Sequence, residues 1–245
     1  MNEQNWFEDW FNSHYYHLLY SNRSEQEAEN FIKKLLNYLQ IPNASKVLDI
    51  ACGKGRHARQ LASFGLDVSG FDLAAESIRI ANESANDKLH FYVHDMRKAF
   101  TEAGPFDYAF NFFTSFGYFE NDNEDQAAFA CFSNALKKGG KLTVDFLNVE
   151  YSLARLVPEE TVQRNPISFH IKKSMDGRYF HKLTSFEDEG KTYEFKERVR
   201  ALRLADFEHL CQLNNLKIVK TFGDYELHDY DPLNSPRLIF IAEKL

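Results

Sequence analysis

Cysteine is scarce in this chain, which has three in 245 residues. They lie far apart, and none belongs to a Cys-x-x-Cys pair: Cys52, Cys131 and Cys211. An odd number of widely spaced cysteines excludes a disulfide framework and argues against a zinc site. We therefore expect neither disulfide bonds nor a bound metal.

Basic charge and long apolar runs are lacking too. The formal net charge is −7 at pH 7, which argues against a broad face for a polyanion such as nucleic acid. No window approaches the roughly 18 uninterrupted apolar residues of a membrane-spanning helix. Residues 1–9 also lack the basic and apolar segments of a signal peptide. We expect a cytoplasmic protein that binds neither nucleic acid nor membranes.

Aromatic residues are abundant, with 23 Phe and 12 Tyr. Residues 5–22 are especially rich in them, and their spacings of three and four predict a helical stripe packed on the domain. A second helix is predicted over residues 24–40, with Ser24 as N-cap and Glu27 completing a capping box. We assign residues 1–40 to an N-terminal helical cap.

Strand and helix patterns alternate from residue 46 onward. The predicted strands are 47–50, 67–71, 89–94, 106–112 and 141–146, and the predicted helices are 56–64, 75–84 and 123–136. This alternation is typical of an α/β domain with a doubly wound parallel sheet. Right-handed crossovers then bring the C-terminal ends of the strands to one edge, where ligands bind. Residues 41–150 form the predicted cofactor-binding core.

Residues 160–200 change character and predict an antiparallel three-stranded meander over 162–172, 179–187 and 192–200. We assign 151–200 to an antiparallel β insertion that serves as a lid or as a dimer interface. A helix over 202–213 and strands over 216–225 and 236–244 follow. Residues 201–245 are therefore expected to complete the core.

A glycine-rich turn joins the first strand of the core to its helix. The strand ends at Asp49-Ile50, the turn is Ala51-Cys52-Gly53-Lys54-Gly55, and the helix opens at Arg56. Such a turn lets backbone N–H groups approach a ligand closely. Asp72 closes the next strand, at about the twenty-residue offset expected of a ribose-binding acid. These features predict a site for a nucleoside-type cofactor.

Two kinds of cofactor fit this turn, because it also satisfies the dinucleotide pattern G-x-G-x-x-G/A. Asp49 would repel a pyrophosphate but would suit an ammonium or sulfonium cation. Asp95-Met96 closes the third strand, where the carboxylate can bond an adenine amino group and the thioether can pack on the ring. The pattern favours a cationic nucleoside over a nicotinamide dinucleotide.

Five motifs occur in the order found in class I S-adenosylmethionine-dependent methyltransferases: Asp49-x-Ala-Cys-Gly-x-Gly, Asp72, Asp95-Met96, Phe106-Asp107-Tyr108 and Leu136-Lys137-Lys138-Gly139-Gly140. Residues 45–148 resemble that family closely. The β insertion resembles that of small-molecule enzymes such as the glycine and aminosugar N-methyltransferases. The resemblance implies a Rossmann-like seven-stranded sheet whose last strand is antiparallel, S-adenosyl-L-methionine as cofactor, and in-line methyl transfer.

The resemblance also implies site residues. The methionine part would face Asp49, Ala51, Cys52, Gly53 and Gly55, with Arg56 or His57 near its carboxylate. Asp72 would bind the ribose, Leu73, Asp95 and Met96 the adenine, while Asn111 and Phe112 would lie beside the methyl group. Tyr16, Tyr20 and Arg23 of the N-terminal segment are expected to cover the cofactor.

The acceptor is less constrained by the sequence. Residues 111–119 lack the Asn/Asp-Pro-Pro-Tyr/Phe motif typical of nucleic-acid amino-methyltransferases, so we expect a small molecule as the acceptor. We expect methylation of nitrogen slightly ahead of methylation of oxygen. Tyr15, Ser115 and Tyr118 are candidate acceptor-binding residues. No catalytic base is assigned, since His94, His181 and His228 have no evident partner.

Three matters stay open at this point. An NAD(P)-binding oxidoreductase and a non-catalytic cofactor-binding protein are the alternative functions. Phe116 and Tyr118 could shape a pocket or belong to the core. The protein could be a monomer or a homodimer.

Overall fold

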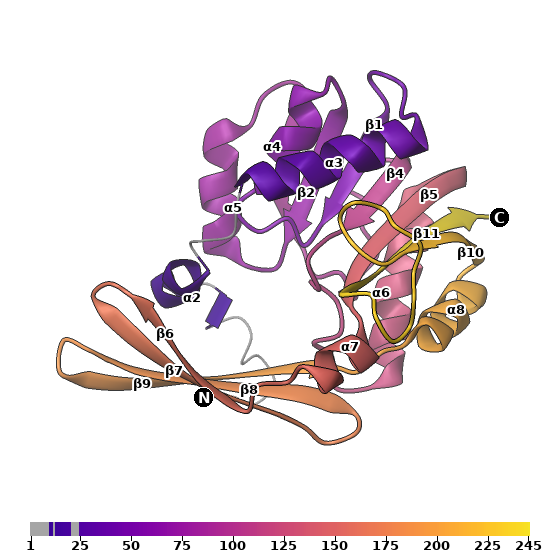
Figure 1. The fold of residues 1–245 in the computed structure, drawn as a ribbon. Coiled ribbons are helices and arrows are strands. Elements are labelled where there is room, and N and C mark those ends of the chain that lie inside the picture. The colour runs from indigo at the N-terminus through magenta and orange to yellow at the C-terminus, as the bar shows by residue number, and fades with distance from the viewer. Residues whose placement is uncertain (1–9, 12, 21–24) are drawn as a thin grey trace.

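A computed structural model describes residues 10, 11, 13–20 and 25–245. Its larger sheet has seven strands in the order β10-β11-β5-β4-β1-β2-β3 (Figure 1). These are β1 (Lys46–Ile50), β2 (Asp67–Asp72), β3 (Leu89–Val93), β4 (Phe106–Asn111), β5 (Leu136–Leu147), β10 (Leu216–Phe222) and β11 (Arg237–Lys244). Strands β1 to β5 pair in parallel, whereas β11 is antiparallel to both of its neighbours. The predicted fold class, with an antiparallel last strand, is confirmed.

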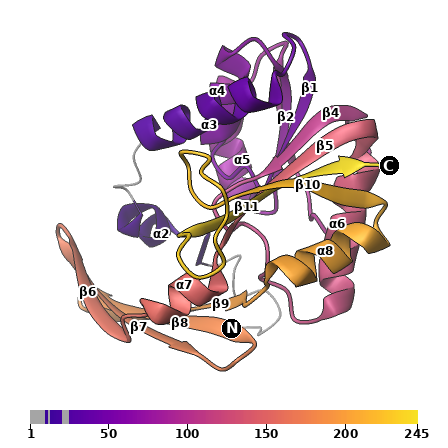
Figure 2. The same cartoon turned by 45° about the vertical axis from the view of Figure 1, so that its right-hand side comes forward.

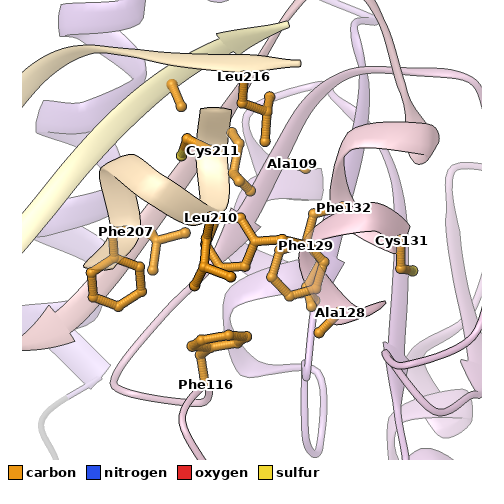
Figure 3. Packing of buried hydrophobic residues seen from close by; sticks show 14 of the residues in the cluster. Ala109, Phe116, Ala128, Phe129, Cys131, Phe132, Phe207, Leu210, Cys211 and Leu216 are labelled. Atoms are coloured by element: carbon orange, nitrogen blue, oxygen red, sulfur yellow. The ribbon is translucent and has the colours of Figure 1, made fainter. Parts of the chain in front are cut away.

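Helices cover both faces of this sheet. On one face α3 (Glu25–Leu39), α4 (Arg56–Ser63) and α5 (Ala75–Ala81) pack their apolar residues against the strands. On the other face α6 (Asp122–Ala135) and α8 (Leu204–Leu213) do the same. Figure 3 shows Phe129, Phe132, Phe207 and Leu210 meeting between these two helices. The aromatic rings of both helices are buried against this face of the sheet.

The β insertion forms a second sheet, which we call the flap, with strand order β6-β7-β8-β9. Its strands are β6 (Glu159–Arg164), β7 (Ile167–Met175), β8 (Tyr179–Asp188) and β9 (Lys191–Arg200). The prediction of three strands is wrong, because the predicted strand 162–172 is broken by a two-residue turn at Asn165-Pro166. Proline has no N–H to donate to a ladder and asparagine favours turns, so the chain reverses there.

Other predicted boundaries also shift. β5 begins at Leu136, so the expected Gly139-Gly140 turn lies within a strand. A short helix α7 (Val149–Ala154), capped by the Asn148 side chain, was not predicted. Between residues 82 and 84 the helical pattern after α5 becomes a 3₁₀ turn, η2 (Asn82–Ser84).

The aromatic N-terminal segment contains α2 (His14–Leu19), whose N-cap is Ser13. A continuous helical stripe is not seen across its described residues, while Trp6, Phe7, Arg23 and Ser24 lie outside them. Trp10 stacks on Phe195 of the flap at 4.5 Å between ring centroids. The two views place α2 between the flap and the helices of the core (Figures 1 and 2). The N-terminal segment therefore packs mainly on the flap.

The flap is anchored to the core at one end. The Arg200 side chain pairs with Asp122 and with the buried Asp125 of α6. The Arg200 N–H donates to the Gly117 carbonyl at 2.7 Å. Burial is the main cause that raises the pKa of Asp125 to about 7. These contacts fix the flap beside the loop that follows β4.

Candidate functional site

A cavity of about 900 Å³ opens at the C-terminal ends of β1, β2, β3 and β4. Its walls come from those strand ends, from α2 and from the flap. It is lined by most of the residues expected at a cofactor or acceptor site: Asp49, Ala51, Cys52, Gly53, Arg56, His57, Asp72, Leu73, Asp95, Met96, Phe112, Tyr16, Tyr20, Ser115 and Tyr118. Residues from separate strands thus meet at one place, as parallel topology requires.

The glycine-rich turn exposes its backbone to this cavity. Ala51 and Gly53 have positive φ values of 58° and 54°. A Cβ added at Gly53 would meet no atom within 4 Å, so glycine leaves room there for a ligand. Gly55 differs, because a Cβ there would lie 2.6 Å from the Phe91 ring. Gly55 does not line the cavity; its lack of a side chain lets α4 pack closely on β3.

Asp49 is a buried acid at the base of the cavity, with only 1% of its surface exposed. Its Oδ2 atom has no hydrogen-bond partner among the described residues. Burial, and then the neighbouring Asp72, raise the pKa of Asp49 to about 8. A cation bound beside this carboxylate would stabilise its ionised form.

Asp72 ties two backbone segments together at the end of β2. Its Oδ2 accepts from the Gly53 N–H at 2.8 Å, and its Oδ1 accepts from the Ala74 N–H at 2.9 Å. Burial raises the pKa of Asp72, although these backbone donors oppose the shift. Each carboxylate oxygen can accept more than one hydrogen bond, so the group keeps capacity for ligand hydroxyls.

Asp95 lies at the next strand end and is held by Arg97. The Arg97 Nη2 atom donates to Asp95 Oδ2 at 2.8 Å, and Nη1 donates to Glu124 at 2.7 Å. Burial would raise the pKa of Asp95, but the Arg97 hydrogen bonds outweigh it, so this pKa lies below the usual value. Asp95 is therefore a fixed, ionised acceptor at the cavity wall.

Cys52 is a packing residue in the turn. Its Sγ atom would lie 2.9 Å from a Cβ placed on Gly70, so it fills the space that this glycine leaves. Burial, and then Asp49 and Asp72, raise the pKa of the thiol well above its usual value. A thiolate is therefore disfavoured at Cys52, which argues against a role as a nucleophile.

Three of the expected residues do not line the cavity within the described structure, and a fourth cannot be placed. Asn111 is fully buried and donates from Nδ2 to the Ile50 carbonyl at 3.1 Å. Tyr15 points to the flap, where its hydroxyl donates to Asp188 at 2.8 Å and its ring packs on Phe186. Gly55 serves packing, as described above, and Arg23 lies outside the described residues.

The three histidines considered as bases differ in position. His94 lines the cavity but packs edge-on against Phe71 and Phe100. His181 and His228 pair with Asp176 and Asp224, at 2.8 Å and 2.7 Å, away from the cavity. This geometry gives no reason to assign a base to any of them.

A charged cluster at the cavity was missed from the sequence. Arg237 of β11 donates from Nε to Asp145 at 2.7 Å and from Nη2 to Thr114 at 2.9 Å. The fully buried Asp145 also accepts from the Phe113 N–H at 2.8 Å and from the Tyr225 hydroxyl at 3.2 Å. Asp145 and Arg237 are 92 positions apart, so no local pattern joins them.

The flap and α2 add cavity residues that were also missed. Glu197 and Lys173 come from the flap, and His17 comes from α2. Burial, followed by repulsion from Lys54 and His14, lowers the pKa of His17 to about 4. The imidazole of His17 is therefore neutral at physiological pH.

Comparison with known proteins agrees with this geometry. Residues 47–140 match the family model described as a methyltransferase domain. These residues form a class I S-adenosylmethionine-dependent methyltransferase domain. A putative methyltransferase of Bacillus subtilis, YqeM, is 27% identical over 83% of this chain and 86% of its own length. An aminosugar N,N-dimethyltransferase of Streptomyces venezuelae is 32% identical over 42% of this methyltransferase and 43% of the relative.

Solved structures share the fold of this methyltransferase. An S-adenosylmethionine-dependent methyltransferase of Clostridium acetobutylicum superposes with a TM-score of 0.79 at 18% identity, covering 94% of this chain and 96% of the other. DesVI of Streptomyces venezuelae superposes with a TM-score of 0.70 at 22% identity, covering 94% and 97%. None of the helices within the described residues is long and apolar enough to cross a membrane.

Proposed function

We propose that this methyltransferase binds S-adenosyl-L-methionine in the cavity and transfers its methyl group to the nitrogen of a small molecule. Asp49 carries the proposal, because its buried carboxyl group has an oxygen without a hydrogen-bond partner among the described residues, and a cationic ligand beside it would stabilise its ionised form. A dinucleotide would bring a pyrophosphate to the same turn, and two negative charges would repel each other there.

The other strand ends suit the remaining parts of the cofactor. We propose that Asp72 accepts from the ribose hydroxyls, while Asp95, Met96 and Leu73 bind the adenine. Arg56 and His57, at the start of α4, would lie near the carboxylate of the cofactor. When bound, S-adenosyl-L-methionine would supply a methyl group carried on a sulfonium. Transfer would leave the sulfur as a neutral thioether, and the acceptor nitrogen would lose one proton to solvent.

The protein would contribute alignment and exclusion of water. Alignment of two reactants can supply roughly 7–11 kcal/mol of a barrier. The segment Phe113–Ser115, held by Asp145 and Arg237, lies at the end of β4 where the methyl group is expected. Nitrogen as the acceptor is supported by the relatives, which include aminosugar N,N-dimethyltransferases and a glycine/sarcosine N-methyltransferase, although a ubiquinone biosynthesis O-methyltransferase is also similar.

Calorimetry tests the cofactor directly. S-adenosylhomocysteine should bind to the purified protein with a stoichiometry of one, and NAD should give no heat. Binding of NAD alone would overturn the proposed function and favour an oxidoreductase. Turnover is tested by release of S-adenosylhomocysteine across a panel of metabolite amines and alcohols. If the protein binds the cofactor but no acceptor leads to release of S-adenosylhomocysteine, it is a cofactor-binding protein without methyltransferase activity.

A further inference from the structure

The inner face of the flap combines an apolar cluster with charged side chains, three of which form a row across adjacent strands. Side chains two residues apart on a strand share a face, and this face carries Phe169, Ile171, Phe186 and Phe195 in the cluster that packs with Trp10 and Leu19. The cross-strand partners Lys173, Lys182 and Glu197 interrupt it on adjacent strands. Charged side chains in an apolar face cost free energy of desolvation, so this row calls for a reason beyond packing.

Glu197 is the member of the row with spare capacity toward the cavity. The Lys182 Nζ atom donates to Glu197 Oε1 at 2.9 Å and also contacts the Tyr20 hydroxyl. The side chains of Lys182 and Glu197 are 17% and 10% exposed, yet of these two only Glu197 lines the cavity. Among the described residues, the second carboxylate oxygen of Glu197 accepts no hydrogen bond.

The position of Glu197 separates it from the proposed cofactor groups. Asp49, Asp72 and Asp95 come from the ends of the core strands or follow them directly, whereas Glu197 enters the cavity from the flap. Lys182, which does not line the cavity, donates to the Glu197 carboxylate, while Glu197 itself lines the cavity. A carboxylate in this setting forms its strongest hydrogen bonds with a charged donor.

We propose that Glu197 binds the amino group of the acceptor in its ammonium form and so selects amines over alcohols. This inference rests on the proposed function. Its role is recognition, because the bound ammonium must lose a proton to solvent before its nitrogen lone pair can attack the methyl group. An alcohol would donate only a neutral hydrogen bond and would bind more weakly.

The test compares matched amines and alcohols as methyl acceptors at saturating S-adenosyl-L-methionine. Suitable pairs are ethanolamine with ethylene glycol, glycine with glycolate, and D-glucosamine with D-glucose. We expect the wild-type protein to use at least one amine in preference to its alcohol. Glu197→Gln keeps the shape of the side chain but removes its charge. It should raise the KM for that amine by about tenfold, the difference between a charged and a neutral hydrogen bond, with a smaller change in kcat.

A control residue lies on the same strand. Glu194 is three positions earlier, is more than half exposed and faces Lys196 at 3.9 Å. Glu194→Gln should leave the amine preference unchanged. Calorimetry with S-adenosylhomocysteine should give the same affinity within twofold for the wild type and both variants.

The inference is overturned if Glu197→Gln leaves the amine KM unchanged, if it weakens the amine and its alcohol equally, or if no amine is a better acceptor than its alcohol. Failure of the wild type to bind S-adenosylhomocysteine would instead overturn the proposed function itself. If Glu197→Gln fails to fold, Glu197→Asp takes its place. This variant keeps the charge but withdraws it by one methylene, and an amine KM equal to that of the wild type would overturn the inference.

Discussion

The two walls of the cavity carry their charges in different ways. On the core wall, Asp49 and Asp72 have raised pKa values because they are buried without a cationic partner close enough to offset burial. On the flap wall, the charged side chains are already paired, as Glu197 is with Lys182 and Lys173 is with Glu160. A cationic ligand would therefore stabilise the core wall at Asp49, whereas the charges of the flap wall are close to balanced before any ligand binds.

From this difference we infer that the core wall binds the cofactor and the flap wall binds the acceptor. The unpaired carboxylates of the core would gain most from one particular cofactor, at the cost of stability in its absence. The paired side chains of the flap can exchange hydrogen bonds with an acceptor without leaving a large buried charge. We expect substitutions on the core wall to change cofactor affinity and substitutions on the flap wall to change only acceptor use.

The largest effect should come from Asp72→Asn. The amide NH₂ group replaces one carboxylate oxygen, so a donor takes the place of an acceptor. This donor must face either a backbone N–H, of Gly53 or of Ala74, or the ribose hydroxyls. Hydrogen bonds to a charged group contribute about 1.5–3 kcal/mol each, so S-adenosylhomocysteine should bind about 100-fold more weakly. Glu76→Gln is the matched control, since Glu76 is exposed in the next helix and pairs with Arg79. Calorimetric affinity within threefold of the wild type for Asp72→Asn would contradict the ribose assignment.

Asp49→Asn should change affinity and stability in opposite directions. The folded protein keeps a proton on Asp49 up to about pH 8, while the unfolded chain releases it near pH 4. This group's contribution to the free energy of unfolding is therefore fully present below pH 4 and is lost as the pH rises to 8. The variant lacks that loss, so its Tm should exceed that of the wild type by several degrees at pH 9 and by little at pH 4.

Asp49→Asn should also weaken cofactor binding by tenfold or more, because the cationic ligand would no longer have a negative charge beside it. In the wild type, affinity for S-adenosylhomocysteine should rise as the pH rises to about 8, because Asp49 loses its proton there and then carries the charge opposite to that of the ligand's α-ammonium group. In the Asp49→Asn variant, the affinity for S-adenosylhomocysteine should no longer rise with pH below pH 8. A wild-type affinity independent of pH between 6 and 8 would show that no cation binds at Asp49.

The two glycines of the turn separate ligand space from packing within the core wall. Alanine at Gly53 adds a Cβ in open space at φ 54°, whereas alanine at Gly55 meets the Phe91 ring. A left-handed backbone costs an L-residue about 1–2 kcal/mol, and overpacking adds about 1–3 kcal/mol. Gly53→Ala should lower affinity for S-adenosylhomocysteine about tenfold with a small fall in Tm. Gly55→Ala carries both costs and should lower the Tm by roughly 4–20 °C. A larger fall in Tm for Gly53→Ala than for Gly55→Ala would contradict the assignment of Gly55 to packing.

The sequence predicts the core wall far better than the flap wall, for a physical reason. Asp49, Asp72 and Asp95 lie at or just beyond the ends of three parallel strands, and parallel topology brings such positions together wherever the strands fall in the chain. The partners of the flap wall are set by strand register, which a sequence does not specify without its turns. Overlooking the turn at Asn165-Pro166 gave one strand too few, and the row of Lys173, Lys182 and Glu197 went unnoticed. The pairing of Asp145 with Arg237 likewise depends on β11 lying beside β5.

The smallest effect is expected from Tyr15→Phe, which tests whether Tyr15 contacts only the flap or also belongs to the cavity. Successive helical residues point about 100° apart, so Tyr16 and Tyr20 share the face of α2 that lines the cavity while Tyr15 contacts the flap. Tyr15→Phe keeps the ring that packs on Phe186 and loses the hydrogen bond to Asp188, which is partly exposed. We expect a fall in Tm of about 1–3 °C, with acceptor KM and cofactor affinity unchanged. An increase in acceptor KM for Tyr15→Phe, without a change in Tm, would return Tyr15 to the acceptor site that the sequence predicts for it.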